Sequence, residues 1–458
     1  MSEEQQIGTS IDPQTITLAI QRRTEMEIAA TLTASHDETK RRRRAIIATI
    51  LGNGFEWFDF MVYGFFAITI GQLFFPTGNE LTSLLLSVAT FGVGFVVRPI
   101  GGILIGMYSD RVGRKAALSL TIVLMAGGTA LIGIAPTYEQ IGIAAPILII
   151  FARLMQGFSA GGEMGSATAF LTEHAPADKK GYYASWIQSS IGFAVVLGAA
   201  AGTVLTLWLT PEEVKAWGWR IPFLLGILIG PIGFYIRSKV DETPAFLATK
   251  EKVKKPFSEV LTNFPRETLT TFSMVILWTV CIYVLLFYMP TYAVKTLKMP
   301  QSMSFIAGVI GGSIITVLSP FVGAWSDRIG RRKILAFSSA GILLLAYPMF
   351  ALVVSSPTQT SLIVFQSVFG ILIAGYTGPI LAAFSEIFPT RILSTGLSVA
   401  YNVAVMTFGG FASLILTWLI ATTGSAMAPA LYVIIAAAIS FLGVTLGFRD
   451  RQAMRAQK

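Results

Sequence analysis

The sequence predicts an all-α integral membrane protein with twelve transmembrane helices in two six-helix repeats. Three observations predict this fold: an apolar composition, twelve apolar segments of membrane-spanning length, and polar motifs that recur in both halves of the chain. Of the 458 residues, 53% are hydrophobic and 13% are charged, and the mean hydropathy is +0.67. Soluble domains carry about 25% charged residues, so a lipid bilayer is the expected solvent.

A helix that crosses a bilayer needs about 20 mostly apolar residues, and twelve segments meet this need. In the first half they are expected at Ile46–Phe74, Thr82–Met107, Ala117–Ala135, Ile143–Thr172, Tyr182–Leu209 and Ile221–Ile236. In the second half they are expected at Thr268–Ala293, Ser302–Ser326, Ile334–Ser355, Thr360–Ser385, Ile392–Thr423 and Met427–Phe448. The predicted divisions are an N-terminal segment (1–45), a first half (46–237), a central loop (238–267), a second half (268–448) and a tail (449–458).

Lysine and arginine residues are concentrated in alternate loops. If both chain ends are cytoplasmic, 28 of the 34 Lys and Arg residues fall on the cytoplasmic side, as the positive-inside rule requires. The first 44 residues are polar and lack the apolar core of a secretory signal. We therefore expect a multi-pass monomer of a bacterial inner (plasma) membrane, with both termini and the central loop in the cytoplasm.

The composition excludes several classes of function. Two histidines, His36 and His174, and the single Cys281 are too few and too scattered for a metal site or a disulfide. We predict no metal, no cofactor and no catalytic activity. The net charge of +9 comes from loops between apolar segments, so no nucleic-acid partner is expected. The sequence contains no G-x-x-x-x-G-K-[ST] phosphate loop of a primary pump.

Two polar motifs repeat between the halves. The sequence SDRVGRK at 109–115 follows the second span, and SDRIGRR at 326–332 follows the eighth. Similarly, EHAP at 173–176 follows the fourth span and EIFP at 386–389 follows the tenth. Two related six-span halves are typical of transporters, which hold their substrate near the membrane midplane between the repeats.

These loops resemble the signature of the major facilitator superfamily, and the resemblance covers about Ile46 to Phe448. Six stretches are similar, in family order, to its metabolite:proton symporter branch, whose permeases transport citrate, tricarballylate, α-ketoglutarate or osmolytes. They are GNGFEWFDF at 52–60, VRPIGG at 97–102, RLMQGFS at 153–159, GGE at 161–163, WGWRIPF at 217–223 and DETP at 241–244. The resemblance implies a secondary carrier that works by alternating access.

Six charged residues lie within or at the edge of the predicted spans, and all of them belong to the first half: Glu56, Asp59, Arg98, Arg153, Glu163 and Arg220. A charge inside a span costs about 2.5 to 3.5 kcal/mol on insertion scales, so it is retained for pairing or for function. Because a buried carboxyl group can be tuned to exchange protons near neutrality, Glu56, Asp59 and Glu163 are the predicted proton-coupling residues. The alternative for Glu56 and Asp59 is that both are permanent ion-pair partners of Arg98 and Arg153, and for Glu163 it is helix packing with a structural pairing role.

Arg98 and Arg220 are predicted to bind substrate, because a guanidinium group binds a carboxylate through two hydrogen bonds and the family resemblance favours both. The alternative for each is a fixed pair with a neighbouring acid. Arg153 shares its span with glycines spaced by four residues, which indicates close helix packing. In the second half, polar and aromatic residues can shape the pocket, and Tyr376 and Asn402 are the predicted substrate contacts. The wider set is Tyr283, Tyr288, Tyr376, Tyr401, Asn402 and Gln366.

The repeated basic loops supply four predicted gating residues, Asp110, Arg114, Asp327 and Arg331. Each aspartate can cap or pair with helix ends of the neighbouring half and hold the inner gate shut in one state. The alternative is that these loops act only as topology signals.

The predicted function is proton-coupled uptake of a small di- or tricarboxylate, with the substrate, protons and the lipid bilayer as partners. The alternative is proton-coupled uptake of a zwitterionic osmolyte such as proline or betaine, whose carboxylate would use the same arginine.

Overall fold

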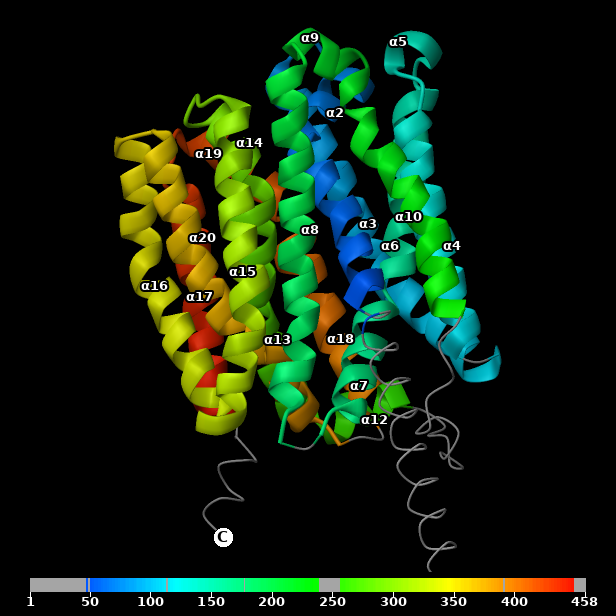
Figure 1. Ribbon diagram of the computed structural model, residues 1–458, viewed down its shortest axis with the longest axis vertical. Coiled ribbons are helices and arrows are strands. Elements are labelled where there is room, and N and C mark those ends of the chain that lie inside the picture. The colour runs from blue at the N-terminus through cyan, green and yellow to red at the C-terminus, as the bar shows by residue number, and fades with distance from the viewer. Residues whose placement is uncertain are drawn as a thin grey trace, which may run out of the picture. The chain divides into compact units, whose positions relative to one another are not determined.

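The computed structural model describes residues 47, 50–112, 114–176, 178–238, 256–389 and 392–448, and these residues are mostly helical, with no strand among them (Figure 1). The chain separates into two units, Met1–Ile47 and Ala48–Lys458, and the helices described below belong to the second. The predicted N-terminal segment (1–45), most of the predicted central loop (residues 239–255) and the predicted tail (449–458) lie outside the described residues.

The first half contains six helical spans at the predicted places. Ile50–Phe65 continues after a 64° bend as α2 (Ala67–Phe74). The next spans are α3 (Glu80–Val112), α4 (Arg114–Ile134), α6 (Ala144–Ala160) with α7 (Glu163–His174), α8 (Lys180–Trp208) and α10 (Arg220–Ser238). Short connections contain α5 (Tyr138–Ile141) and α9 (Pro211–Glu213) with η1 (Val214–Gly218).

The second half begins with α12 (Pro256–Asn263) and contains six more helical spans. Two of them are interrupted by π-helical turns: α13 (Pro265–Val280), η2 (Cys281–Tyr288) and α14 (Met289–Lys295) form one, and α18 (Leu393–Val405), η4 (Met406–Gly410) and α19 (Ala412–Thr423) form another. The others are α15 (Gln301–Ile329), α16 (Arg331–Ser355), α17 (Gln359–Ile387) and α20 (Ala428–Leu442) with η5 (Gly443–Gly447).

Nine helical stretches of the described residues are long and apolar enough to cross a membrane, and the bent pair Ile50–Phe65 and Ala67–Phe74 makes ten. The two remaining predicted spans correspond to α4, whose apolar stretch is the shorter Leu120–Ile134, and to α10. The prediction of an all-α membrane protein built from two six-helix halves is confirmed.

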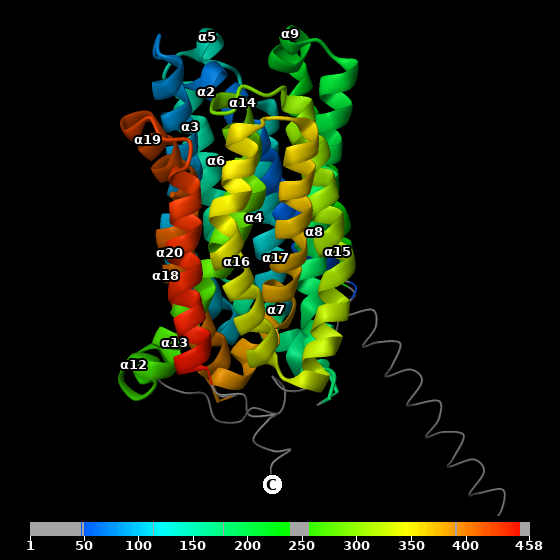
Figure 2. The same cartoon turned by 90° about the vertical axis from the view of Figure 1, so that its left-hand side faces the viewer.

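The halves pack most extensively through α8 and α15, which lie side by side (Figures 1 and 2). Small residues allow this approach: a Cβ atom on Gly312 would lie 2.9 Å from the carbonyl oxygen of Gly192, and one on Gly192 would lie 2.8 Å from the backbone nitrogen of Thr316. Close backbone contact of this kind is a common basis of helix association in membranes.

A second close contact joins α3 to α6 within the first half. A Cβ atom on Gly94 would lie 2.9 Å from the carbonyl oxygen of Arg153, and one on Gly102 would lie 3.0 Å from that of Gly161. On the fourth span, a Cβ atom on Gly157 would meet the carbonyl oxygen of Gly94, and one on Gly161 would meet that of Arg98. Close packing at these two glycines is as predicted. This contact also fixes the backbone at Arg153 and at Arg98, which lies between Gly94 and Gly102 on α3.

Adding one methyl group to α15 tests this packing. We expect Gly312→Ala to destabilise the protein by about 1 to 3 kcal/mol, the usual cost of overpacking. The single cysteine, Cys281, is fully buried, so its reaction with a thiol-sensitive dye during heating reports unfolding. The matched control is Gly308→Ala one turn away, where the added Cβ would meet Ala199 at an ordinary 3.4 Å. Equal unfolding temperatures for the two variants would contradict the close α8–α15 contact.

Candidate substrate and proton site

Two buried arginines, Arg98 on α3 and Arg153 on α6, lie against the same aromatic ring. Arg153 is fully buried and Arg98 is 2% exposed. The Cζ atom of Arg98 is 4.9 Å from the centre of the Phe60 ring, and that of Arg153 is 5.1 Å from it. Phe95 also contacts Arg98 at 4.3 Å, and Phe91 contacts Arg153 at 4.5 Å. The negative faces of these rings stabilise the guanidinium groups, each by up to about 2 kcal/mol.

The rings do not satisfy the hydrogen-bond donors of the two arginines. Among the described residues, neither arginine makes an ion pair. The Nε atom of Arg98 and the Nε and Nη2 atoms of Arg153 are buried without an acceptor. Unpaired charged donors in a dry interior are costly, so this arrangement is suited to an anion that supplies the missing acceptors.

Aromatic residues of the second half cover the arginine pair. From η2, Phe287 stacks on Phe91 at 4.3 Å and Tyr283 meets Phe95 edge-on at 5.2 Å. The hydroxyl groups of Tyr283 and Tyr401 interact electrostatically with Arg98. A π-helical turn such as η2 often marks a functional site. The arginines therefore lie at the interface of the two halves, and their site is closed in this conformation.

The three predicted proton-coupling acids line one small cavity inside the first half. Glu56, Asp59 and Glu163 surround a space of ≈ 40 Å³ between the helix Ile50–Phe65, α4, α7 and α10. The acids are 5 to 9% exposed, and the space is large enough for a few water molecules. The three acids therefore line a cavity that neither arginine borders.

Asp59 is connected to Arg153 through two neutral side chains. Thr129 donates from Oγ1 to Asp59 Oδ2, Gln156 donates from Nε2 to Thr129 Oγ1 at 2.9 Å, and Arg153 donates from Nη1 to Gln156 Oε1 at 2.6 Å. Within the described part of the chain, Asp59 forms no direct ion pair with either arginine. For Asp59, the alternative of a permanent ion pair is therefore wrong in this conformation.

Three residues that were predicted to contact the substrate form hydrogen bonds with backbone carbonyl groups in the structure. Arg220 donates from Nη1 to the carbonyl oxygens of Gly133 at 3.1 Å and Ala135 at 2.7 Å, so it caps the C-terminal end of α4. The Tyr376 hydroxyl donates to the carbonyl oxygen of Met274 at 2.8 Å. Asn402 donates to the carbonyl oxygen of Gly161 at 3.2 Å and keeps a buried Oδ1 without a donor. Their substrate roles stay predictions.

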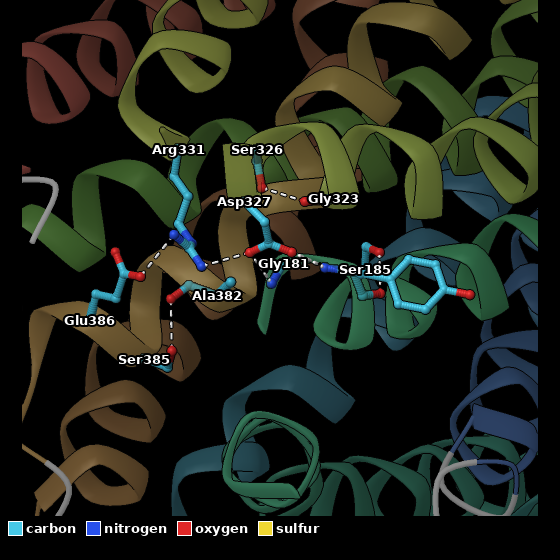
Figure 3. Close-up of polar contacts among 10 residues, drawn as sticks. Gly181, Ser185, Gly323, Ser326, Asp327, Arg331, Ala382, Ser385 and Glu386 are labelled. Carbon is cyan, nitrogen blue, oxygen red and sulfur yellow. Dashed lines mark hydrogen bonds and ion pairs between the residues drawn. The ribbon is translucent and has the colours of Figure 1, made fainter. Parts of the chain in front are cut away.

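Asp327, at the end of α15, holds the first turn of α8 in the other half (Figure 3). Its carboxylate accepts from the backbone nitrogens of Gly181 at 2.8 Å and Tyr182 at 2.9 Å, groups that have no partner within α8 itself. Arg331 donates to Asp327 at 2.9 Å and to Glu386 at 2.9 Å. This is the geometry expected of a gate, and the gating role itself stays a prediction. The side chains of the related Asp110 and Arg114 lie outside the described residues.

At the opposite end of α15 the halves meet through an exposed ion pair. Lys295 lies 2.7 Å from Glu80, and their side chains are 29% and 76% exposed. The pair borders a cavity of ≈ 280 Å³ with Tyr288, Thr291 and Thr417. Exposed ion pairs contribute about 1 kcal/mol or less, so this end is closed less firmly than the end that contains Asp327.

Two six-helix halves that enclose a charged site between them define a membrane transporter. Residues 49–413 match the family profile of the Major Facilitator Superfamily. The chain therefore belongs to that family and is a multi-pass membrane transporter, not an enzyme.

Relatives agree on this family and differ in substrate. The chain is 36% identical over 407 residues to a citrate-proton symporter of Klebsiella pneumoniae, covering 88% of this chain and 91% of that protein. It is 35% identical over 430 residues to a proline/betaine transporter of Escherichia coli, covering 88% and 83%. Its fold is similar to that of the xylose transporter XylE from E. coli in a partially occluded inward-open conformation, with a TM-score of 0.72, 16% identity and coverage of 88% and 97%.

Asp327→Asn tests the gate. The variant removes the charge and one acceptor, so a buried hydrogen bond to a charged group is lost at a cost of about 1.5 to 3 kcal/mol. Ser185 is buried, and a cysteine placed there in a Cys281→Ser background reports on opening of the gate. We expect a thiol reagent to label this cysteine at least about tenfold faster in Asp327→Asn than in the protein that keeps Asp327. Arg328→Gln is the control, because Arg328 lies beside Asp327 and its side chain is exposed. Unchanged labelling in Asp327→Asn would show that this cap does not hold the halves together.

Proposed function

We propose that this transporter is a proton-coupled symporter that takes up a small di- or tricarboxylate by alternating access. One observation carries the proposal: Arg98 and Arg153 lie together at the interface of the halves, buried, and without an ion pair among the described residues. Two guanidinium groups suit a substrate with more than one carboxylate, because each binds a carboxylate bidentately. The citrate-proton symporter among the relatives supports the same substrate class.

Alternating access follows from the placement of this site between the halves. The halves must separate at one end while they stay closed at the other, since the substrate can reach the arginines only when the covering rings move. The Asp327 cap closes the end that we propose to be cytoplasmic, and the Lys295–Glu80 pair closes the outer end. The proposed topology keeps both termini and the central loop (238–267) in the cytoplasm of a bacterial cell, with the six-helix halves at 46–237 and 268–448.

The coupled proton is assigned to the acids of the small cavity. Asp59, Glu56 and Glu163 line this cavity within the first half, and Thr129 and Gln156 lie between Asp59 and Arg153. A proton on Asp59 would remove negative charge beside Arg153, which favours binding of an anion at the arginine pair. Proton and substrate anion would then enter together, as symport requires.

A second candidate function is proton-coupled uptake of a zwitterionic osmolyte. The observation in its favour is a group of rings beside Arg98: Trp57 is 5.8 Å from Trp278 and 5.8 Å from Tyr283, and Trp278 is 5.2 Å from Tyr401. Aromatic faces bind quaternary ammonium groups, so betaine could place its carboxylate on Arg98 and its ammonium group against these rings. The proline/betaine transporter among the relatives supports this candidate.

Uptake into proteoliposomes under an imposed pH gradient tests the function. We expect labelled di- or tricarboxylates to accumulate when the outside is acidic, and a protonophore should abolish the accumulation. Liposomes without protein are the control, and proline and betaine are measured in the same series. Accumulation driven by sodium alone would contradict proton coupling, and accumulation of betaine but no carboxylate would favour the second candidate.

Substitutions of Arg98 test the anion site, because they separate the effect of the positive charge from that of the guanidinium geometry. Lysine keeps the charge but loses the planar fork, so we expect Arg98→Lys to raise the apparent KM at least about tenfold, as expected for lost charge-assisted hydrogen bonds. Arg98→Ala should abolish uptake. Arg266→Lys is the control, because Arg266 is exposed in the first turn of α13, and it should leave the KM nearly unchanged. Normal carboxylate binding by Arg98→Ala combined with Asp59→Asn would refute the role of Arg98.

A further inference from the structure

We infer that Thr129 and Gln156 form a hydrogen-bond relay through which protonation of Asp59 releases Arg153 for the substrate anion. The inference rests on the proposed function, because it takes Asp59 as the proton-coupling group. It assigns a positioning role to two neutral residues that touch neither the bulk solvent nor the aromatic wall of the second half. Both side chains are fully buried.

The relay crosses three helices in three consecutive bonds. Arg153 and Gln156 lie on α6, Thr129 on α4 and Asp59 on the helix Ile50–Phe65. The Arg153–Gln156 bond is 2.6 Å and the Gln156–Thr129 bond is 2.9 Å long, and Thr129 donates to Asp59. The alignment is possible because Arg153 and Gln156 are three residues apart and so share one face of α6.

Arg153 sets the direction of the relay. A guanidinium group has only donors, so the side-chain oxygen of Gln156 must face Arg153 and its NH₂ group must face Thr129. Thr129 Oγ1 therefore accepts a hydrogen bond from Gln156. Its single hydrogen then has two acceptors in reach, Asp59 Oδ2 and the carbonyl oxygen of Met125 at 3.0 Å.

The single hydrogen of Thr129 makes the relay respond to the charge of Asp59. When Asp59 is ionised, Thr129 donates to the carboxylate, and the three bonds polarise one another in the same direction, which strengthens the hold of Gln156 on Arg153. When Asp59 is protonated, its new O–H group donates to Thr129, and the Thr129 hydrogen turns to Met125. The Thr129 oxygen then accepts hydrogen bonds from both Asp59 and Gln156, and Thr129 no longer donates to a negative charge. The bonds polarise one another less, so Gln156 holds Arg153 less strongly.

The surroundings contain few other groups that could carry the same signal. Glu56 and Glu163 face Asp59 around the small cavity, and α10 contributes Gly226, where a Cβ atom would lie 2.7 Å from Asp59 Oδ1. The charged and titratable groups that act electrostatically on Arg153 are Tyr63, Arg98, Tyr283 and Asp59 itself. Among these described residues, the Thr129–Gln156 path forms a continuous chain of hydrogen bonds from Asp59 to Arg153.

The pH dependence of substrate affinity tests the relay. In the wild-type protein, the apparent KM for the carboxylate should fall as the pH is lowered, because protonated Asp59 frees Arg153. Thr129→Val keeps the shape but removes the hydroxyl group, and we expect it to reduce the ratio of the KM values at neutral and acidic pH about tenfold. Thr129→Ser keeps the hydroxyl group and should keep the wild-type ratio.

Gln156→Met gives a second interruption, so the test does not depend on the folding of Thr129→Val. It should flatten the pH dependence in the same way, and reaction of Cys281 during heating shows whether each variant is folded. A wild-type ratio in folded Thr129→Val or Gln156→Met would overturn the relay while leaving the symporter intact. Absence of any pH dependence or gradient-driven uptake in the wild-type protein would instead overturn the proposed function.

Discussion

The structure depends on keeping two guanidinium groups in its interior without an acidic partner among the residues that it describes. Transfer of such a charge from water costs several kcal/mol, and the rings of Phe60, Phe91 and Phe95 offset only part of that cost. The glycine contacts between α3 and α6 hold both arginines in place, so they cannot extend to the lipid headgroups. Under the proposed function, an anionic ligand completes the site, and this requirement ties the α3–α6 packing to the choice of substrate.

Besides the interaction of Arg98 with Tyr283 and Tyr401 in the middle, the halves make charged contacts at both ends of the helices. At one end, Asp327 closes over backbone nitrogens of α8 in a buried network, and at the other Lys295 meets Glu80 in a solvent-exposed pair. Between them the halves touch through aromatic rings and glycines, which can separate without breaking a salt bridge. Under the proposed alternating access, one end opens and the covering rings move while the contacts at the other end stay closed.

Much of the fold was predictable from sequence, because long apolar segments and loop charges report directly on a membrane. The cap by Asp327 was also predictable, since the repeated loop places an acid opposite helix ends of the other half. The relay was not predicted from the sequence, although Gln156 follows Arg153 by three residues and so lies on the same face of the helix. Its partner Thr129 comes from another helix, and only the packing of α4 on α6 brings them together. Arg220 was predicted to bind substrate, and in the structure it caps α4. The sequence could not distinguish these roles, because a basic residue near the end of a span can serve either.

In the proposed mechanism, the arginine pair between the halves binds the substrate anion. The most direct measurement is an experimental structure of the protein with a bound di- or tricarboxylate. We expect carboxylate oxygens within hydrogen-bond distance of Arg98 Nε and Arg153 Nη2, which are donors without an acceptor in this structure. A bound carboxylate that contacts neither arginine, with both still packed on Phe60, would contradict the proposed mechanism.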